Sequence, residues 1–264
     1  MLLIGTFWWT PDAGSKFAAA YTVQDVLRLQ RAVAKHCTVE HQFVVITDQP
    51  HLFTHVSNLV RAVPLDKTTH VPGTCYTRLM TFHPDGPALF GAERLLQIDL
   101  DTLIVGNIDH LGKRLENIIL WRNPARVPWD ETEIKSQIYR NGEGQLRYAN
   151  NTRRCYYNTS VLMHRLGSMP WIWEDFVTRR DNKMPLQAKD DQWLLSDHFG
   201  NGAPYFDGAR DGVYRIARED TPGSGVWGDL PENACVVTCP GSEGKANNPR
   251  VRAANPWINE YLAA

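Results

Sequence analysis

Two aspartates inside an apolar segment are the residues of this sequence best suited to chemistry. The segment LLQIDLDTLIVGNID (residues 95–109) is rich in Leu, Ile and Val, yet it carries Asp99 and Asp101. No Lys or Arg lies between Arg94 and Lys113. Because buried carboxylates are normally paired or bound to a metal, something outside the local sequence must neutralise these two charges.

The spacing of the two aspartates indicates a shared site. Side chains two apart on a strand point to the same face, so Asp99 and Asp101 project together, or converge at the carboxyl end if the strand turns there. Parallel α/β sheets bind ligands at that end. Two carboxylates suit Mg²⁺ or Mn²⁺, which share their coordination with water and substrate phosphates. The alternative is that both aspartates are solvated or cap a turn.

The elements that must position the aspartates alternate between strands and helices. Residues 2–9 and 43–47 are apolar, as in buried strands, and apolar residues recur at helical spacing between Thr22 and His36. This order predicts a parallel sheet covered on both faces. We therefore expect a single α/β domain over residues 1–264, Rossmann-like, with a mostly parallel central sheet flanked by helices.

The rest of the chain continues this scheme and contains one irregular region. Further elements are expected as a short helix at 75–83, strands at 118–121 and 155–164, and helices at 171–180 and 190–199. Residues 122–154 hold prolines, glycines and many charges, so they are predicted to form a flexible excursion where an acceptor is contacted.

Composition narrows the class of protein. A net charge of −1 and a pI of about 6.8 give no global basic field of the kind that marks many nucleic-acid binders. The sequence shows neither an export signal nor an apolar run long enough for a membrane span. The odd number of scattered cysteines then favours reduced thiols in a cytoplasm; these are Cys37, Cys75, Cys155, Cys235 and Cys239.

The aspartate segment resembles the Asp-x-Asp segment of glycogenin and other family-8 glycosyltransferases, a family with many small bacterial and phage relatives. Four other stretches resemble family landmarks and follow in the family's order, so that the resemblance covers residues 2 to about 200. They are TVEHQFVVITDQP (38–50), CYTRLMTF (75–82), YYNTSVLMH (156–164) and DDQWLLS (190–196).

The resemblance implies a type-A glycosyltransferase fold and a metal-dependent, hexosyltransferase-like enzyme. Such an enzyme uses Mn²⁺ or Mg²⁺ to bind a nucleotide-sugar, usually a UDP-sugar, and transfers the sugar with retention of configuration. The resemblance leaves the acceptor undetermined: a glycan, a protein, a small molecule and a modified DNA base all fit. Two other hypotheses also stay open: a metal-dependent nucleotidyl- or phosphotransferase, and a non-catalytic nucleotide-sugar-binding relative.

The resemblance also assigns roles around the metal and the sugar. Asp101 is expected to bind the metal, and Asp99 to contact the metal, the ribose or both. Arg78 is expected to bind phosphate or a carboxylate that faces the sugar, and its ordinary alternative is a surface salt bridge. Asn158 is a candidate for the transferred sugar or else a buried strand amide. Asp191, with Gln192 beside it, would stabilise the transition state or simply cap a helix.

The nucleotide end and the tail complete the candidate site. Thr6 after the first strand and Asp48 after the second are placed to meet ribose or base. Lys245 follows a glycine-containing loop and suits a leaving diphosphate. The family has a histidine metal ligand in this tail, where the present sequence has Cys239 and Pro240. Cys239, Glu243 and water are therefore the candidates for the third metal ligand.

Overall fold

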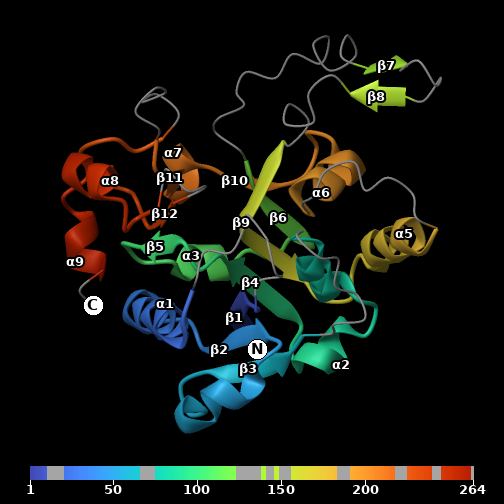
Figure 1. Cartoon of the computed structure of the whole chain (residues 1–264), viewed down its shortest axis with the longest axis horizontal. Coiled ribbons are helices and arrows are strands. Elements are labelled where there is room, and N and C mark those ends of the chain that lie inside the picture. The colour runs from blue at the N-terminus through green and yellow to red at the C-terminus, as the bar shows by residue number, and fades with distance from the viewer. Residues whose placement is uncertain are drawn as a thin grey trace.

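A seven-stranded sheet crosses the centre of the computed structural model (Figure 1), which describes residues 1–10, 21–65, 75–122, 138–140, 146–148, 156–182, 191–217, 225–239 and 245–262. The strand order is β10-β6-β9-β4-β1-β2-β3. The bounds are β1 (Leu2–Trp8), β2 (His41–Thr47), β3 (Arg61–Pro64), β4 (Arg94–Ile98), β6 (Ile118–Arg122), β9 (Tyr157–Arg165) and β10 (Tyr205–Phe206).

Strand direction decides which residues share an edge of this sheet. β9 is antiparallel to its neighbours β4 and β6, whereas every other neighbouring pair is parallel. The carboxyl ends of six strands therefore meet the amino end of β9 at one edge, which we call the carboxyl edge. The α/β class and the mostly parallel central sheet are confirmed.

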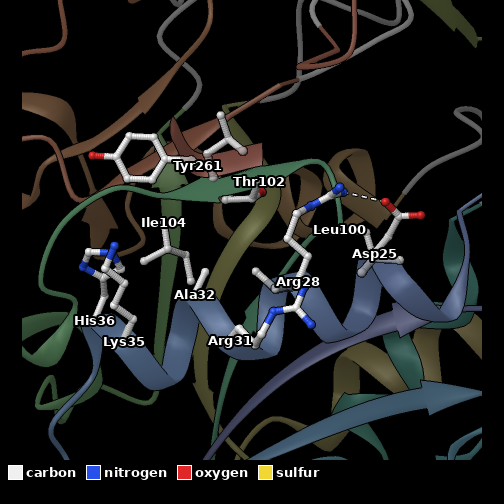
Figure 2. Close-up of a pocket in the computed structure, with 12 residues that line it drawn as sticks. Asp25, Arg28, Arg31, Ala32, Lys35, His36, Leu100, Thr102, Ile104 and Tyr261 are labelled. Carbon is white, nitrogen blue, oxygen red and sulfur yellow. Dashed lines mark hydrogen bonds and ion pairs between the residues drawn. The ribbon is translucent and has the colours of Figure 1, made fainter. Parts of the chain in front are cut away.

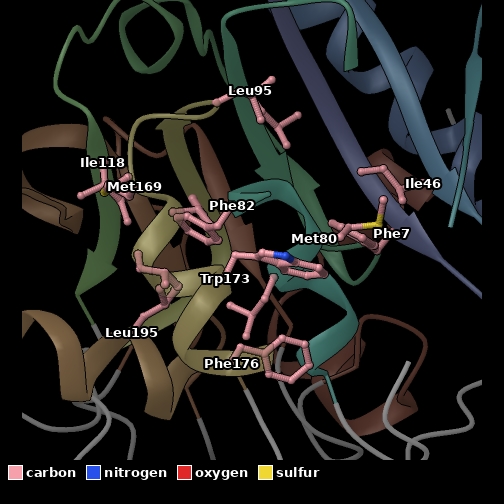
Figure 3. Packing of buried hydrophobic residues seen from close by; sticks show 14 of the residues in the cluster. Phe7, Ile46, Met80, Phe82, Leu95, Ile118, Met169, Trp173, Phe176 and Leu195 are labelled. Atoms are coloured by element: carbon pink, nitrogen blue, oxygen red, sulfur yellow. The ribbon is translucent and has the colours of Figure 1, made fainter. Parts of the chain in front are cut away.

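Helices cover both faces of the sheet, and their apolar sides supply two core layers. One layer packs β-strand residues such as Leu95 and Leu120 against η3, α5 and α6, as Figure 3 shows for Phe82, Trp173 and Phe176. The other layer packs Leu96 and Trp121 with α1. The helices are α1 (Val23–His36), η1 (Pro50–Val56), η3 (Tyr76–Phe82), α2 (Gly86–Phe90), α3 (Asp109–Gly112), α5 (Pro170–Asp181) and α6 (Asp191–Phe199).

The predicted elements are present with small shifts at their ends. The expected helix at 75–83 is a 3₁₀ helix, η3, and the expected strand at 155–164 corresponds to β9. Helix α1 has the predicted amphipathic pattern, with Val26, Leu29 and Val33 buried on one side.

A small second sheet fixes the segment that follows the aspartates. β5 (Thr102–Ile104) pairs with β12 (Val236–Thr238), which also pairs with β11 (Val213–Arg215). The backbone N–H of Cys239 donates to the Asp101 carbonyl oxygen at 2.8 Å. Three further helices belong to this half of the chain: α7 (Gly208–Asp211), α8 (Pro249–Ala254) and α9 (Ile258–Leu262).

The region predicted as an excursion, residues 122–154, lies largely outside the described residues. Arg122 ends β6, and β7 (Ile138–Arg140) pairs with β8 (Leu146–Tyr148) in a two-stranded sheet of their own. Cys155, Pro240 and Glu243 also lie outside the described residues. Among the helices that the structure describes, none has the length and apolar character needed to cross a bilayer.

Candidate active site

The acidic pair lies in a tight turn between β4 and β5 at the carboxyl edge. The N–H of Asp99 donates to the Ser160 carbonyl oxygen at 2.9 Å, and the N–H of Thr102 donates to the Asp99 carbonyl oxygen at 3.2 Å. The strand thus turns directly after Ile98, and Asp99 and Asp101 occupy the turn. Of the two expected geometries, convergence at the strand end is the one observed.

A buried arginine neutralises the first aspartate. Arg78 on η3 donates from Nη1 to Asp99 Oδ1 at 2.6 Å and from Nη2 to Asp191 Oδ1 at 3.1 Å. The side chains of Arg78 and Asp191 are only 7% and 2% exposed. Burial alone would lower the pKa of Arg78, but the carboxylates of Asp191 and Asp99 outweigh it and raise that pKa. A surface salt bridge is therefore the wrong interpretation of Arg78.

A tail lysine neutralises the second aspartate. The ammonium of Lys245 pairs with Asp101 Oδ2 and donates to the hydroxyl of Tyr21, with Nζ and the phenolic oxygen 2.5 Å apart. Burial would lower the pKa of Lys245, yet the Asp101 carboxylate reverses this and raises it. Both aspartates are thus held by distant cations, as the absence of local Lys and Arg predicts.

The surroundings of Asp101 also shift the pKa of its neighbours. Burial and the carboxylate of Asp99 raise the pKa of Asp101, and Lys245 opposes that shift. Burial, then the charge of Asp101, raises the pKa of Tyr21 to about 12, so its hydroxyl keeps its proton at neutral pH. Tyr21 lies two residues before the start of α1 and belongs to the site, although no sequence motif pointed to it.

Asn158 reaches the same edge because β9 runs against its neighbours. It pairs with Trp121 of β6 where the register of the two strands shifts, an irregularity common beside active sites. Its Oδ1 accepts the N–H of Ser160 at 2.7 Å, which steadies this irregular stretch. Gln192, next to Asp191, is half-buried at the start of α6.

The two residues expected at the nucleotide end differ in placement. Asp48 follows β2 as predicted, and its Oδ1 accepts the N–H of Thr10 at 3.1 Å. The placement of Thr6 after the first strand is wrong, because Thr6 lies inside β1 and its side chain is fully buried. It alternates with Leu2 and Ile4 on the face of β1 that packs in the core layer of α1.

The donor set for a divalent metal consists of two carboxylates. Within the described part of the chain, no group of three or more His, Cys, Asp or Glu residues is positioned to hold a metal. Burial raises the pKa of the Cys239 thiol to about 12, and a protonated sulfur is a poor ligand for Mn²⁺ or Mg²⁺. Oδ2 of Asp99 and Oδ1 of Asp101 make no hydrogen bond to described residues. Such ions are commonly held by one or two carboxylates plus substrate phosphates, so the residues fit.

A cavity of about 110 Å³ lies beside the same turn, between α1 and the Leu100–Ile104 segment (Figure 2). Arg28 points from α1 toward Thr102 and Leu100 and pairs with Asp25 at 2.5 Å. The cavity lining excludes Asp99 and Asp101. It is therefore separate from the acidic site.

Comparison with solved structures identifies the fold. A galactosyltransferase, LgtC, solved in complex with donor and acceptor sugar analogues, matches with a TM-score of 0.57 and 15% identity, over 100% of this chain and 95% of that one. The apo form of the glycosyltransferase GlyE from Streptococcus pneumoniae TIGR4 matches with a TM-score of 0.58 and 12% identity. That match covers 99% of this chain and 60% of GlyE.

The fold is the type-A glycosyltransferase fold. No protein-family model matches the sequence, and no curated protein matches it either. At sequence identities of 15% and 12%, the two similarities show the fold and nothing further about this chain. Within this glycosyltransferase fold, five of the predicted site residues form two linked clusters at the carboxyl edge: Asp99, Asp101, Arg78, Asp191 and Lys245.

Proposed function

We propose that this chain is a metal-dependent glycosyltransferase that moves a sugar from a nucleotide-sugar, of the UDP type, to an acceptor with retention of configuration. The observation that carries the proposal is the set of three carboxylates and two cations at the carboxyl edge of a type-A glycosyltransferase fold. LgtC, which shares this fold, was solved with donor and acceptor sugar analogues.

The charge of the site supports a divalent cation. Among the described residues, the site holds three carboxylates, Asp99, Asp101 and Asp191, against two cations, Arg78 and Lys245. A nucleotide diphosphate is itself an anion, and this excess would repel it in a partly buried site. When bound by Asp99 and Asp101, Mn²⁺ or Mg²⁺ supplies the positive charge that offsets the leaving diphosphate.

The two cations have different roles in the proposed reaction. Lys245 leaves Asp101 and donates to the diphosphate, because its flexible stem and single charged group suit phosphate. Arg78 stays between Asp99 and Asp191 and keeps both carboxylates oriented. Asp191 then presents its carboxylate to the positive charge that develops on the sugar, and Asn158 donates to a sugar hydroxyl.

The experiment is a donor screen. The protein is incubated with Mn²⁺ and a panel of UDP-, GDP- and ADP-sugars, and release of the nucleoside diphosphate is measured by chromatography. We expect release from one donor class and its loss after EDTA treatment. The Asp101→Asn variant should release none. The control is Glu93→Gln, which changes an exposed carboxylate just before the first residue of β4 and should behave as the unmodified protein.

The same screen separates the alternatives. Release of sugar 1-phosphate, with the nucleoside monophosphate transferred to the acceptor, would show a nucleotidyl- or phosphotransferase. Saturable binding of a nucleotide-sugar without release, over a range of acceptors, would show a non-catalytic relative. Either result would contradict sugar transfer.

A further inference from the structure

The carboxyl edge continues past Asn158 to a second arginine, Arg122, at the end of β6. Its Cα is paired with that of Tyr157, the neighbour of Asn158 in sequence. Opposed Cα atoms in an antiparallel pair are about 5 Å apart. Arg122 therefore lies opposite Tyr157, one residue along β9 from Asn158.

Strand alternation places Arg122 on the same face of the sheet as the acidic site. Trp121 belongs to the core layer of α1, whereas Leu120 belongs to the layer of η3, α5 and α6. Residue 122 must then face the layer of η3 and α6. This is the layer that carries Arg78 and Asp191, and Tyr205, the partner of Arg122, packs against it.

Two guanidinium groups lie over the ring of Tyr205, and they differ in one respect. Arg210, with its Cζ 5.3 Å from the ring centroid, is neutralised by Asp211 at 2.7 Å and by Asp207 at 3.7 Å. Arg122, at 4.8 Å, donates to the Tyr205 hydroxyl at 3.1 Å. No carboxylate among the described residues pairs with Arg122, although its side chain is half-buried.

The position of Arg122 decides which ligand it serves. β6 is two strands from β4, or about 10 Å at the usual strand spacing, and it lies on the side away from β1 and β2. The diphosphate beside Asp101 and the nucleotide near Asp48 are thus beyond its reach. In the proposed reaction, this leaves the acceptor as the reactant within reach of Arg122.

We propose that Arg122, held on Tyr205, is a specificity-determining residue that binds an anionic group, a carboxylate or phosphate, on the acceptor. The planar guanidinium makes paired hydrogen bonds to either group. This inference rests on the proposed sugar transfer, and it makes the preferred acceptor an acidic sugar or a phosphorylated glycan. With a neutral acceptor, none of the described carboxylates would supply the half-buried cation with a counter-charge.

The test compares acceptors that differ only in charge. With the best donor and Mn²⁺, kcat/KM is measured for glucose against glucuronate and glucose 6-phosphate, and for galactose against galacturonate. We expect the acidic member to be preferred at least about 10-fold, because a charge-assisted hydrogen bond is worth that much or more. Arg122→Gln should abolish the preference and Arg122→Lys should keep part of it.

The matched control is Arg210→Gln, which removes the other guanidinium over Tyr205 and should keep the acid preference. The ratio of acidic to neutral acceptor cancels any general loss of activity, and thermal unfolding verifies that each variant folds. Equal use of acidic and neutral acceptors, or an unchanged ratio in Arg122→Gln, would overturn the proposal.

A second measurement separates failure of this inference from failure of the proposed function. Binding of glucose 6-phosphate is titrated calorimetrically in the presence of UDP and Mn²⁺, which requires no turnover. Binding that weakens at least 10-fold in Arg122→Gln but not in Arg210→Gln supports the anion site even if no donor is cleaved. Absence of binding to the unmodified protein contradicts it, whatever the donor screen gives.

Discussion

Arg78 and Lys245 each neutralise one aspartate of the same turn, yet their surroundings differ. Arg78 is 7% exposed and joins two carboxylates from separate elements, the turn after β4 and the start of α6. Lys245 is 24% exposed, has one carboxylate partner among the described residues, and belongs to the tail. The guanidinium is rigid and multiply bonded, whereas the ammonium is flexible and bonded to one acid.

This difference indicates a fixed and an exchangeable half of the site. Breaking the Arg78 contacts would leave Asp191 charged and buried, which is costly. Breaking the Lys245 contact leaves a partly exposed Asp101 at the proposed site of the divalent cation. Lys245 can therefore be replaced at Asp101 and move to an incoming diphosphate, while Arg78 stays in place.

The largest expected effect is on stability. Arg78→Leu should reduce the free energy of unfolding by about 3–5 kcal/mol, the usual penalty for removing one partner of a buried ion pair. Lys245→Leu should reduce it by less, because the pair that it breaks is partly exposed and therefore partly screened by solvent. Denaturant unfolding of both variants measures the contrast. Equal losses would contradict the division into fixed and exchangeable halves.

The next largest effect is that of replacing Lys245 on the use of the nucleotide-sugar and on the affinity for Mn²⁺. Lys245→Met should lower kcat/KM for the nucleotide-sugar by roughly 100-fold, since it removes a charged hydrogen bond to phosphate. The same variant should bind Mn²⁺ more tightly without nucleotide, because the competing ammonium is gone from Asp101. Electron paramagnetic resonance of free Mn²⁺ measures this affinity. Weaker Mn²⁺ binding in Lys245→Met would show that the two cations do not compete, and Lys245→Arg is the charge-retaining control.

His164, a buried basic side chain, contrasts with the two site cations Arg78 and Lys245. His164 of β9 is fully buried, and its ring stacks on Phe82 at 4.5 Å between centroids. Neither ring nitrogen has a hydrogen-bond partner among the residues that the structure describes. Burial, with a smaller effect of Arg94, lowers its pKa from 6.5 to about 3. Unlike Arg78, this side chain stays uncharged in the folded protein.

The consequence is a stability that depends on pH. Between pH 6.5 and 3 the unfolded chain binds a proton at His164 that the folded chain does not, so stability is complete above 6.5 and falls as the pH falls. We expect a loss of about 2 kcal/mol from this group between pH 6.5 and 5. His164→Leu should flatten that part of the curve in thermal unfolding. An identical pH dependence in the variant would mean that His164 does not control it.

The smallest expected effect is that of the Tyr21 hydroxyl on Lys245. Tyr21→Phe removes one neutral hydrogen-bond acceptor from the ammonium and should cost about 1 kcal/mol, or several-fold in KM for the nucleotide-sugar. Steady-state kinetics at saturating Mn²⁺ measure it. A loss as large as that of Lys245→Met would assign Tyr21 a direct role with the donor.

The sequence was most informative where local pattern and chemistry coincide. An apolar run without cations identified Asp99 and Asp101, and alternating strand and helix patterns predicted the sheet. The parallel order of β1, β2 and β4 then placed the ends of these strands at one edge. These properties depend on residues close together in the chain.

Contacts across long sequence separations could not be deduced in this way. Arg78 lies 21 residues from Asp99 and 113 from Asp191, and Lys245 lies 144 residues from Asp101. The family resemblance singled out these cations, but only the fold shows which carboxylate each one meets. Thr6 was misplaced because an apolar strand does not reveal from sequence where its exposed end begins.

The most direct test of the central claim is a crystal structure with Mn²⁺ and a UDP-sugar, in which anomalous scattering locates the metal. We predict a Mn²⁺ peak within bonding distance of Asp99 and Asp101. The Lys245 ammonium should then have moved from Asp101 to the diphosphate, and Arg78 should be unmoved between Asp99 and Asp191. A bound UDP-sugar with no metal at the turn, and with Lys245 still paired to Asp101, would contradict the account.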